Sequence, residues 1–272
     1  MVFHGFNSYC KGQVHGELFA NHIQEVTGMH AECVEIDANF DDTTGAWNAS
    51  VFNDFPKYTE KACEALRNNP NFNNGQEFNL VGLSQGSLVS RYVIEECPDL
   101  KVRNLFTLGG PHRGVGEIPF CHEGDWCMGL NYLADNFSEK PELQHQVNPA
   151  SYFRGVSDLD AYMRVSIFLP YINNEKDYKE QRREQMLKLN HAVFAMTTGD
   201  EVIYPKDSAI FAELQWDGSV LHRHDTEIWK KDLLGLKTME DEGRATFLTK
   251  DGIHIEFTND WFDENILPIF QS

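Results

Sequence analysis

The stretch NLVGLSQGSLVSRYV, residues 79–93, decides the fold. An apolar run ends at Val81, and two glycines then enclose a serine in Gly82-Leu83-Ser84-Gln85-Gly86. Apolar residues recur at helical spacing after this turn. A G-x-S-x-G pattern between a buried strand and a helix is typical of a nucleophile elbow, a strained turn that exposes its serine. The pattern predicts that Ser84 is a nucleophile; the alternative is a tight turn with a helix-capping serine.

Strand-like and helix-like patterns alternate on both sides of this turn. Such alternation is typical of a parallel sheet with helices on both faces. We therefore predict the α/β class, with a doubly wound and mostly parallel sheet. After a first strand that ends at residues 2–3, strands are predicted at 32–37, 77–82, 102–110, 191–199 and 244–250, and helices at 16–28, 55–69, 87–97 and from about residue 260.

Residues from about 112 to 190 interrupt the alternation. They hold several short helical patterns and the charged run EKDYKEQRREQMLKL at 175–189. An insertion in a doubly wound sheet often covers the functional site as a cap. Because no segment has the composition of a linker, we expect residues 1–272 to form one domain with a cap at about 112–190.

The composition disfavours several classes of protein. The chain has 272 residues, of which 41% are hydrophobic, and this is enough for a sizeable core. It contains no run of about 18 apolar residues, so we expect no transmembrane segment. The formal net charge is −19, whereas a nucleic-acid-binding protein normally presents a basic face. We therefore expect no nucleic acid partner.

Six cysteines favour an oxidising compartment. They can pair in fifteen ways, and they lack the close Cys/His spacing of a zinc site. Glycosylation sequons begin at Asn48 and Asn136. These features favour the secretory pathway; the alternative is a cytosolic enzyme with six buried thiols. No signal peptide opens the sequence, so we expect its N-terminus to be truncated or processed.

A nucleophilic serine on such an elbow needs two backbone donors for the developing oxyanion. One donor is the N–H of the residue after the serine, here Gln85. The other comes from a loop after an early strand, and the sequence VFHGFNSYC at 2–10 fits that position. Gly5 would let the backbone approach the site, which makes the N–H of Phe6 the second donor. The alternative is an ordinary glycine turn.

The acid of a catalytic triad should follow the serine in sequence and lie just past a strand. Asp200 directly follows the predicted strand 191–199. Asp207 is a nearby competitor, but it lies beyond Pro205 and suits a turn or a helix cap better. The sequence therefore favours Asp200.

The base of the triad should lie between the last strand and the final helix. His254, in DGIHIEF at 251–257, is the histidine in that position. His222 and His224 are rivals on a polar segment that is more typical of a surface or cap contact. In the predicted triad Ser84 attacks an acyl carbon, His254 transfers the proton, and Asp200 fixes the histidine tautomer.

At this point the chain resembles the palmitoyl-protein thioesterase family, lysosomal enzymes that remove long fatty acyl groups from cysteine thioesters. The resemblance runs nearly from end to end. The nucleophile segment NLVGLSQGSLVSRYV matches that of the family. Further matches are HGFNSYC (4–10), LGGPHRGVGEIPFC (108–121), SIFLPYINNE (166–175), DEVIYPKDS (200–208), LLGLKTMEDEGRATFL (233–248) and DGIHIEF (251–257).

This resemblance implies an α/β-hydrolase fold, with the triad Ser84, Asp200 and His254 and the N–H groups of Phe6 and Gln85 as the oxyanion hole. It implies S-acylated proteins or peptides and other long-chain acyl thioesters as substrates, and a lysosomal or secretory location. It also implies the disulfides Cys63–Cys97 and Cys121–Cys127, and Cys33 would have to be the partner of Cys10. Asn7, Ser87 and Gly199 depart from the family pattern, so substrate preference could differ.

The expected chemistry needs neither a metal nor a cofactor, because a thioester is already activated and its thiolate leaves readily. A long acyl chain needs an apolar groove, and residues 166–172 and 201–205 are candidates for its walls. The alternative is that these runs belong to the core. Three other functions stay open: a lipase or carboxylesterase that acts on oxygen esters, an acyl-CoA-type thioesterase of a sister branch, and a non-catalytic binding homologue.

Overall fold

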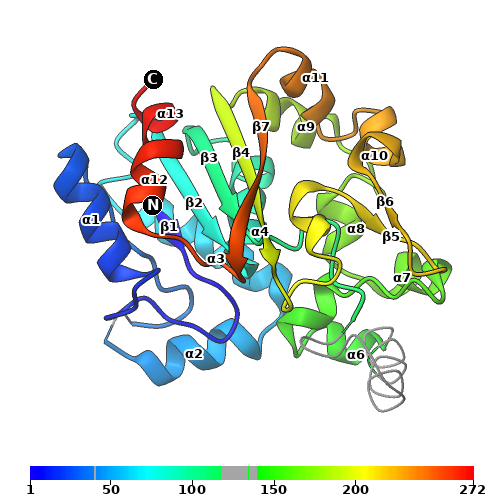
Figure 1. Cartoon of the computed structure of the whole chain (residues 1–272). Helices are drawn as coiled ribbons and strands as arrows, with labels where there is room; N and C mark the ends of the chain where they lie inside the picture. The colour runs from blue at the N-terminus through cyan, green and yellow to red at the C-terminus, as the bar shows by residue number, and fades with distance from the viewer. Residues whose placement is uncertain (40, 118–133, 135–139) are drawn as a thin grey trace.

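The computed structural model describes residues 1–39, 41–117, 134 and 140–272, and its centre is a five-stranded parallel sheet (Figure 1). The strand order is β1-β2-β3-β4-β7, with every neighbouring pair parallel. Parallel strands that are covered on both faces are usually continuous apolar runs, as in β4, which lies between β3 and β7. The strands are β1 (Val2–Phe3), β2 (Phe78–Leu83), β3 (Val102–Leu108), β4 (His191–Gly199) and β7 (Ala245–Ile253).

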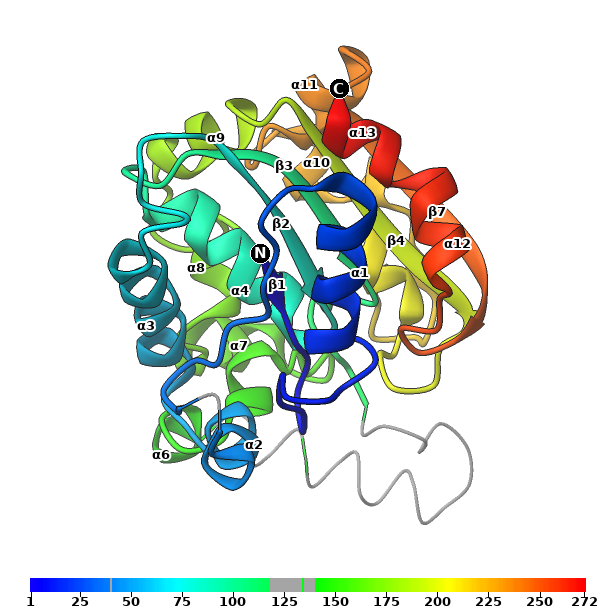
Figure 2. The ribbon, with the colours of Figure 1, turned by 90° about the vertical axis from the view of Figure 1, so that its left-hand side faces the viewer.

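Helices cover both faces of this sheet, as the two ribbon views show together (Figure 2). One face carries α1 (Glu17–Thr27), α12 (Asn259–Asn265) and α13 (Leu267–Gln271), and the other carries α3 (Phe55–Asn68) and α4 (Gln85–Glu96). Each face has its own hydrophobic core cluster. The prediction of a doubly wound α/β fold is therefore confirmed.

Local sequence signals explain where several helices begin and end. The side chain of Asp54 accepts the N–H of Lys57 at the start of α3, where Pro56 occupies the first turn. Gly28, with φ of 70°, ends α1 in the left-handed conformation. The final helical pattern is split into α12 and α13, because Pro268 has no N–H for a continuous helix.

The predicted strand at 32–37 is wrong. Only Cys33 in this segment makes a bridge, to Val2 of the two-residue strand β1. A ladder cannot continue where its neighbour ends, and Asp37 then turns the chain with φ of 63°. The buried side chains of this segment make other contacts, among them the Cys10–Cys33 disulfide.

The region predicted as a cap contains short helices in its described part, whereas 118–133 and 135–139 lie outside the described residues. Phe168 and Leu169 from this region lie in the same core cluster as Phe55 of α3. The helices are α6 (Pro141–Gln144), α7 (Leu159–Val165), α8 (Leu169–Ile172) and α9 (Glu180–Leu187), with the 3₁₀ turn η1 (Asn148–Tyr152). α9 packs against α4, so the C-terminal end of this region belongs to the helical layer that covers the α3 and α4 face of the sheet.

The remaining elements are peripheral to the sheet. A small antiparallel ribbon is formed by β5 and β6. No helix in the described part of the chain has the length and apolar character to cross a membrane. The elements are α2 (Thr43–Val51), η2 (Lys206–Ile210), β5 (Glu213–Leu214), β6 (Val220–Leu221), η3 (Arg223–Asp225), α10 (Glu227–Lys230) and α11 (Leu236–Asp241).

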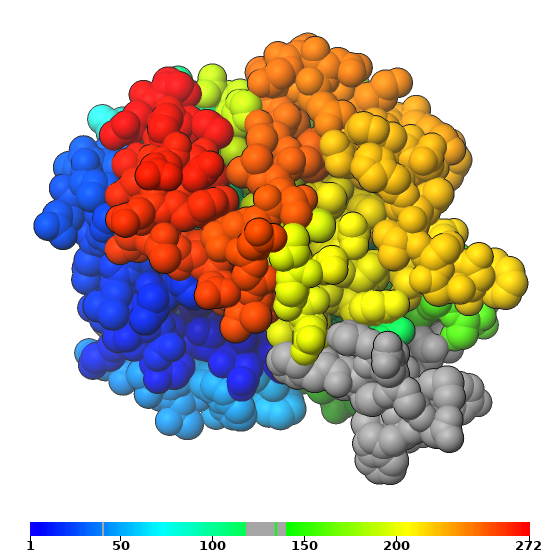
Figure 3. Space-filling view, viewed as in Figure 1, coloured from blue at the N-terminus to red at the C-terminus, as the bar shows by residue number. Residues whose placement is uncertain are grey.

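The N-terminal and C-terminal segments of the chain meet on one face, where blue and red atoms adjoin (Figure 3). The ring of His15 stacks on that of Phe257, with centroids 4.6 Å apart. His22 of α1 lies 3.0 Å from the carboxylate of Asp263 in α12. These contacts fix the segment after β1 against the segment after β7, and both of these segments line the site described next.

Candidate active site

Ser84 stands on a strained turn between β2 and α4. Its φ is 52° and its ψ is −124°, a conformation that non-glycine residues rarely adopt. Its N–H donates to the carbonyl oxygen of Leu108 at 2.9 Å, which holds the turn against β3. The hydroxyl is thereby presented at the carboxyl end of β2, next to the positive end of the α4 dipole.

The glycines on either side of the serine are required by close backbone approach. A Cβ at Gly82 would lie 2.6 Å from the Cα of Ser87, and a Cβ at Gly86 would lie 2.2 Å from the carbonyl oxygen of Phe3. No side chain can be accommodated at either position without moving backbone atoms. The G-x-S-x-G pattern therefore reflects the tight packing of α4 against β1 and β2.

A chain of hydrogen bonds joins Ser84 to His254 and Asp200. The Nε2 atom of His254 lies 2.9 Å from the Oγ atom of Ser84, and its Nδ1 atom lies 2.7 Å from Oδ2 of Asp200. The other carboxylate oxygen of Asp200 accepts the N–H groups of Val202 and Ile203 at 2.9 and 3.0 Å. With its carboxylate fixed in this way, Asp200 holds the imidazole with Nε2 facing the serine.

Strand register explains why residues so far apart in sequence meet. Gly199 of β4 pairs with Ile253 of β7, so the next residues, Asp200 and His254, emerge side by side. Gly109, which follows β3, has φ of 62° and leaves room for the imidazole. A Cβ there would lie 2.9 Å from the Cε1 atom of His254.

The rival residues lie elsewhere. Asp207 is in η2, where its carbonyl oxygen accepts the N–H of Ala212. His224 lies 2.9 Å from the carboxylate of Glu240, and its main-chain N–H donates to the ring of His222. His254 is thus the histidine that the structure brings to Ser84.

The two predicted oxyanion donors flank Ser84. Gln85 is the first residue of α4, and N–H groups in the first turn of a helix have no partner within it. Its side chain is fixed, since Nε2 donates to the carbonyl of Ser50 at 3.0 Å and Oε1 accepts the hydroxyl of Tyr152 at 2.9 Å. A Cβ at Gly5 would lie 3.0 Å from the Cβ of Ser84, so only glycine lets the backbone before Phe6 come this close.

A pocket of about 440 Å³ opens above Ser84 and His254. Val202 is one of its walls, whereas the adjacent Ile203 is 4% exposed and belongs to the core. Residues 168, 169 and 172 of the other predicted wall are also in the core, so the core alternative holds for them. The other side chains that line the pocket are His4, Phe6, Asn7, Ser8, Gln13, Val14, His15, Leu83 and Ile255.

Two disulfides are present in the described residues, and no free cysteine is found there. Cys63–Cys97 joins α3 to the end of α4. Cys10–Cys33 joins the segment between β1 and α1 to the segment that follows α1. Cys121 and Cys127 lie outside the described residues, as does the sequon residue Asn136. Asn48 is exposed on α2.

His4 and Glu35 were not predicted as site residues. They form a buried pair, with His4 Nε2 3.2 Å from Glu35 Oε2. A ring nitrogen of His4, a carboxylate oxygen of Glu35 and the sulfur of Cys10 lie within 4.8 Å of one another, and each is an atom type that can bind a metal ion. The sulfur is bonded to Cys33, however, and offers no thiolate. The position of His4 beside Gly5 in HGFNSYC could have marked it as a site residue. No local pattern points to Glu35, which lies 31 residues away.

Comparisons with known proteins converge on one family. A model of the palmitoyl protein thioesterase family matches residues 1–254. Palmitoyl-protein thioesterase 1 of Caenorhabditis elegans is 33% identical over 72% of this chain and 66% of that protein. Palmitoyl-protein thioesterase 3 of Dictyostelium discoideum is 28% identical over 82% of this chain and 78% of that protein.

A human relative is named lysosomal thioesterase PPT2 and is 26% identical over 65% of this chain and 59% of that protein. The matched regions thus span just under two thirds of the nematode protein and about three fifths of the human one. Among solved structures, a monoacylglycerol lipase from Paleococcus ferrophilus aligns over 99% of this chain and 91% of that chain, with 13% identity and a TM-score of 0.48.

Proposed function

The chain belongs to the palmitoyl protein thioesterase family, and from this premise we propose that it is a serine hydrolase that removes long-chain fatty acyl groups, such as palmitoyl, from S-acylated cysteines of proteins or peptides. The observation that carries the proposal is the hydrogen-bonded chain from Ser84 through His254 to Asp200. These three side chains lie at the carboxyl edge of an α/β-hydrolase sheet, and Ser84 stands on the turn that the G-x-S-x-G segment forms.

Acylation of the enzyme uses the groups that are already in contact. Ser84 Oγ attacks the thioester carbonyl carbon while His254 Nε2 takes the hydroxyl proton. The carbonyl oxygen becomes an oxyanion that accepts hydrogen bonds from the N–H groups of Phe6 and Gln85. The C–S bond then breaks, His254 gives its proton to the departing sulfur, and an acyl-serine remains.

Deacylation repeats these steps with water. His254 takes a proton from a water molecule, whose oxygen attacks the acyl carbon of the acyl-serine. Collapse of the second tetrahedral intermediate returns the proton to Ser84 Oγ and releases the fatty acid. Asp200 stays ionised throughout and stabilises the imidazolium that forms at each proton transfer.

Chain-length preference would come from apolar contacts beside the triad. Each methylene that leaves water contributes about 0.8 kcal/mol. The apolar side chains that line the pocket are Phe6, Val14, Leu83, Val202 and Ile255. We propose that the predicted cap at about 112–190, apart from α9 and the buried residues of α8, covers the site and extends this apolar surface.

An oxidising compartment suits these features. Disulfides such as Cys10–Cys33 and Cys63–Cys97 persist in secretory and lysosomal environments, whereas the cytosol keeps thiols reduced. A relative in the comparison carries a lysosomal name. We therefore propose a lysosomal or secretory location, with glycosylation at Asn48 and Asn136.

Matched acyl peptides test the proposal. One peptide carries S-palmitoyl cysteine and the other carries O-palmitoyl serine at the same position. We expect faster turnover of the thioester, with palmitoyl-CoA as a second thioester that lacks a peptide. Preference for the oxygen ester or for a triglyceride would instead place the protein among esterases or lipases, and preference for palmitoyl-CoA over the peptide would indicate an acyl-CoA-type thioesterase.

A further inference from the structure

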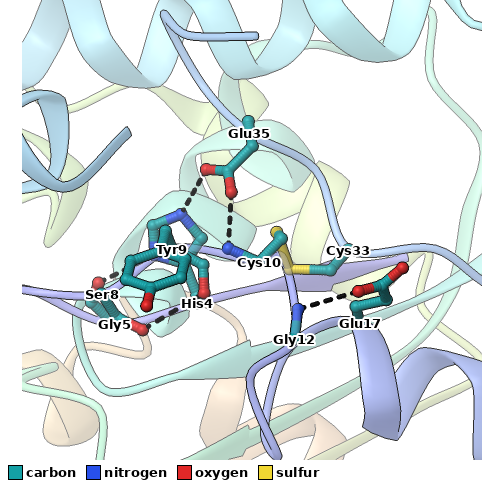
Figure 4. Close-up of a disulfide and its surroundings, with 9 residues drawn as sticks. All are labelled: His4, Gly5, Ser8, Tyr9, Cys10, Gly12, Glu17, Cys33 and Glu35. Carbon is teal, nitrogen blue, oxygen red and sulfur yellow. Dashed lines mark hydrogen bonds and ion pairs between the residues drawn. A yellow bond between two sulfur atoms is a disulfide. The ribbon is translucent and has the colours of Figure 1, made fainter. Parts of the chain in front are cut away.

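His4 lies between the Gly5–Phe6 peptide, which belongs to the segment 4–10 that we call the oxyanion loop, and the buried carboxylate of Glu35 (Figure 4). Its Nδ1 atom is 3.0 Å from the carbonyl oxygen of Gly5, and its Nε2 atom is 3.2 Å from Oε2 of Glu35. The residue is 6% exposed, and the side chain of Glu35 is 3% exposed. Because a carbonyl oxygen can only accept, the hydrogen bond with Gly5 requires that Nδ1 of His4 is the donor.

The contact with Gly5 acts on the peptide that donates to the oxyanion. The carbonyl of Gly5 and the N–H of Phe6 belong to one planar trans peptide, so they point in opposite directions. A hydrogen bond that holds the Gly5 carbonyl toward the His4 ring therefore directs the Phe6 N–H away from that ring. A rotation of this peptide would move the Phe6 N–H. The position of the donor decides how strongly an oxyanion hole stabilises the oxyanion.

We propose that His4 is a positioning residue, which orients the Gly5–Phe6 peptide so that the Phe6 N–H can donate to the oxyanion formed at Ser84. This inference rests on the proposed function, because it assigns His4 a part in the same site. The Gly5 backbone packs directly against Ser84, so the peptide that His4 holds is next to the nucleophile.

Glu35 anchors His4 from the other side. Its second oxygen, Oε1, accepts the main-chain N–H of Cys10. Glu35 follows two residues after Cys33, and Cys10 is bonded to Cys33 (Figure 4). The disulfide and this carboxylate therefore tie together the two segments that flank the His4 ring. A carboxylate buried to this extent is costly unless it is paired and hydrogen-bonded, as it is here.

Two amide substitutions separate positioning of the peptide from general support of the loop. In His4→Asn the amide nitrogen can take the place of Nδ1 and keep the contact with Gly5. In His4→Gln the amide nitrogen can take the place of Nε2 and keep the contact with Glu35. If His4 positions the Gly5–Phe6 peptide, His4→Asn retains activity and His4→Gln loses it; a loop support that acts through Glu35 gives the reverse order.

The measurement is kcat and KM for a palmitoyl thioester, together with the rate at which a fluorophosphonate labels Ser84. We expect His4→Gln to lower kcat by about 10- to 100-fold with KM nearly unchanged, because the oxyanion forms only during reaction. His4→Asn should stay within about threefold of the parent. The matched control is His224→Ala, which removes another histidine–carboxylate pair, with Glu240 and away from Ser84, and should leave kcat unchanged.

Glu35→Gln gives an independent reading if His4→Gln does not fold. Its amide oxygen can accept the Cys10 N–H and its amide NH₂ can donate to His4 Nε2, so the Nδ1 contact with Gly5 persists and kcat should stay near that of the parent. Equal losses in His4→Asn and His4→Gln, or a loss in Glu35→Gln as large as that expected of His4→Gln, would overturn the proposal. The labelling rate needs no acyl thioester. A parent that is labelled but hydrolyses no thioester would overturn the proposed function, while the order of the labelling rates would still decide the role of His4.

Discussion

The Nε2 atom of His254 lies 2.9 Å from the Oγ atom of Ser84, although 170 positions separate the two residues in the chain. The contact follows from the parallel sheet, which brings the carboxyl ends of β2, β4 and β7 to one edge. Asp200, at the end of β4, completes the hydrogen-bonded chain at 2.7 Å. The fold thus joins the three side chains of the proposed triad in one hydrogen-bonded chain.

Loss of any member of this chain should nearly abolish hydrolysis while the protein stays folded. Ser84→Ala removes the nucleophile, His254→Ala the base and Asp200→Ala the orienting carboxylate, and each should lower kcat by about 10⁴-fold or more. Because the three act as one unit, the double variant of Ser84 and His254 should be little worse than either single variant. Initial rates with a palmitoyl thioester and circular dichroism spectra check both expectations.

Asp207→Ala is the matched control for the acid, since Asp207 lies in η2, outside the hydrogen-bonded chain. It should keep turnover near that of the parent. If Asp207→Ala were crippled and Asp200→Ala turned over normally, the assignment of the acid would be wrong.

Gly5→Ala should lower activity with a small effect on stability. The new methyl would lie 3.0 Å from the Cβ of Ser84 and 3.5 Å from its Oγ, so either the oxyanion loop or the serine must shift. We expect kcat/KM to fall by about 10-fold or more, because small displacements of reacting groups are costly. The control is Gly75→Ala, at a φ of 83° with open space around it, which should cost about 1 kcal/mol of unfolding free energy and no activity. Parent-like turnover in Gly5→Ala would argue against close packing of this loop on Ser84.

Glu95 makes stability depend on pH. Burial raises the pKa of its carboxyl from 4.5 to about 7, although Arg91 at 2.9 Å opposes the shift. The folded protein therefore binds this proton more tightly than the unfolded chain does. The stability contributed by the protonated carboxyl is full below about pH 4.5 and is lost as the pH rises through about 7. The unfolding free energy should accordingly fall between these values.

Urea unfolding from pH 4.5 to pH 7 tests this expectation. Glu95→Gln resembles the protonated side chain and should flatten the dependence on pH. The same substitution at Glu64, which is exposed on α3, should leave the dependence as it is in the parent. An identical slope in Glu95→Gln and the parent would exclude Glu95 as the source.

The disulfides should be separable by peptide mapping and by stability. Mass spectrometry of non-reduced peptides should show Cys10–Cys33, Cys63–Cys97 and Cys121–Cys127 in protein from a secretory host. Replacing Cys63 and Cys97 together by alanine should cost about 3 kcal/mol of unfolding free energy, because the open chain regains conformational entropy. Six free thiols in such protein would contradict both the pairing and the proposed compartment.

Local pattern and chain order were sufficient to point to three side chains that the structure brings into hydrogen-bond contact, Ser84, His254 and Asp200. Ser84 lies in a motif whose glycines are imposed by packing, and Asp200 and His254 each follow a strand that pattern alone predicts. The strand at 32–37 failed because its only neighbour, β1, has two residues. No local signal could have shown this.

Contacts between distant segments account for what the sequence could not give. Ile203 and Val202 are adjacent apolar residues, yet Ile203 is buried in the core and Val202 faces the pocket. The pairing of His4 with Glu35 spans 31 positions and depends on the path that the chain takes after β1. Such choices are made by tertiary packing, which periodicity does not encode.

The most direct test of the central claim is a chain-length series of acyl thioesters, measured as kcat/KM from acetyl to palmitoyl. For the parent protein, kcat/KM should rise steadily toward palmitoyl, by up to a few-fold for each methylene buried. Val202→Asp, on the pocket wall, should flatten the series, whereas Val220→Asp on the exposed ribbon strand β6 should keep it. A parent profile that peaks between acetyl and butyryl, or faster hydrolysis of a triglyceride than of the palmitoyl thioester, would contradict the account.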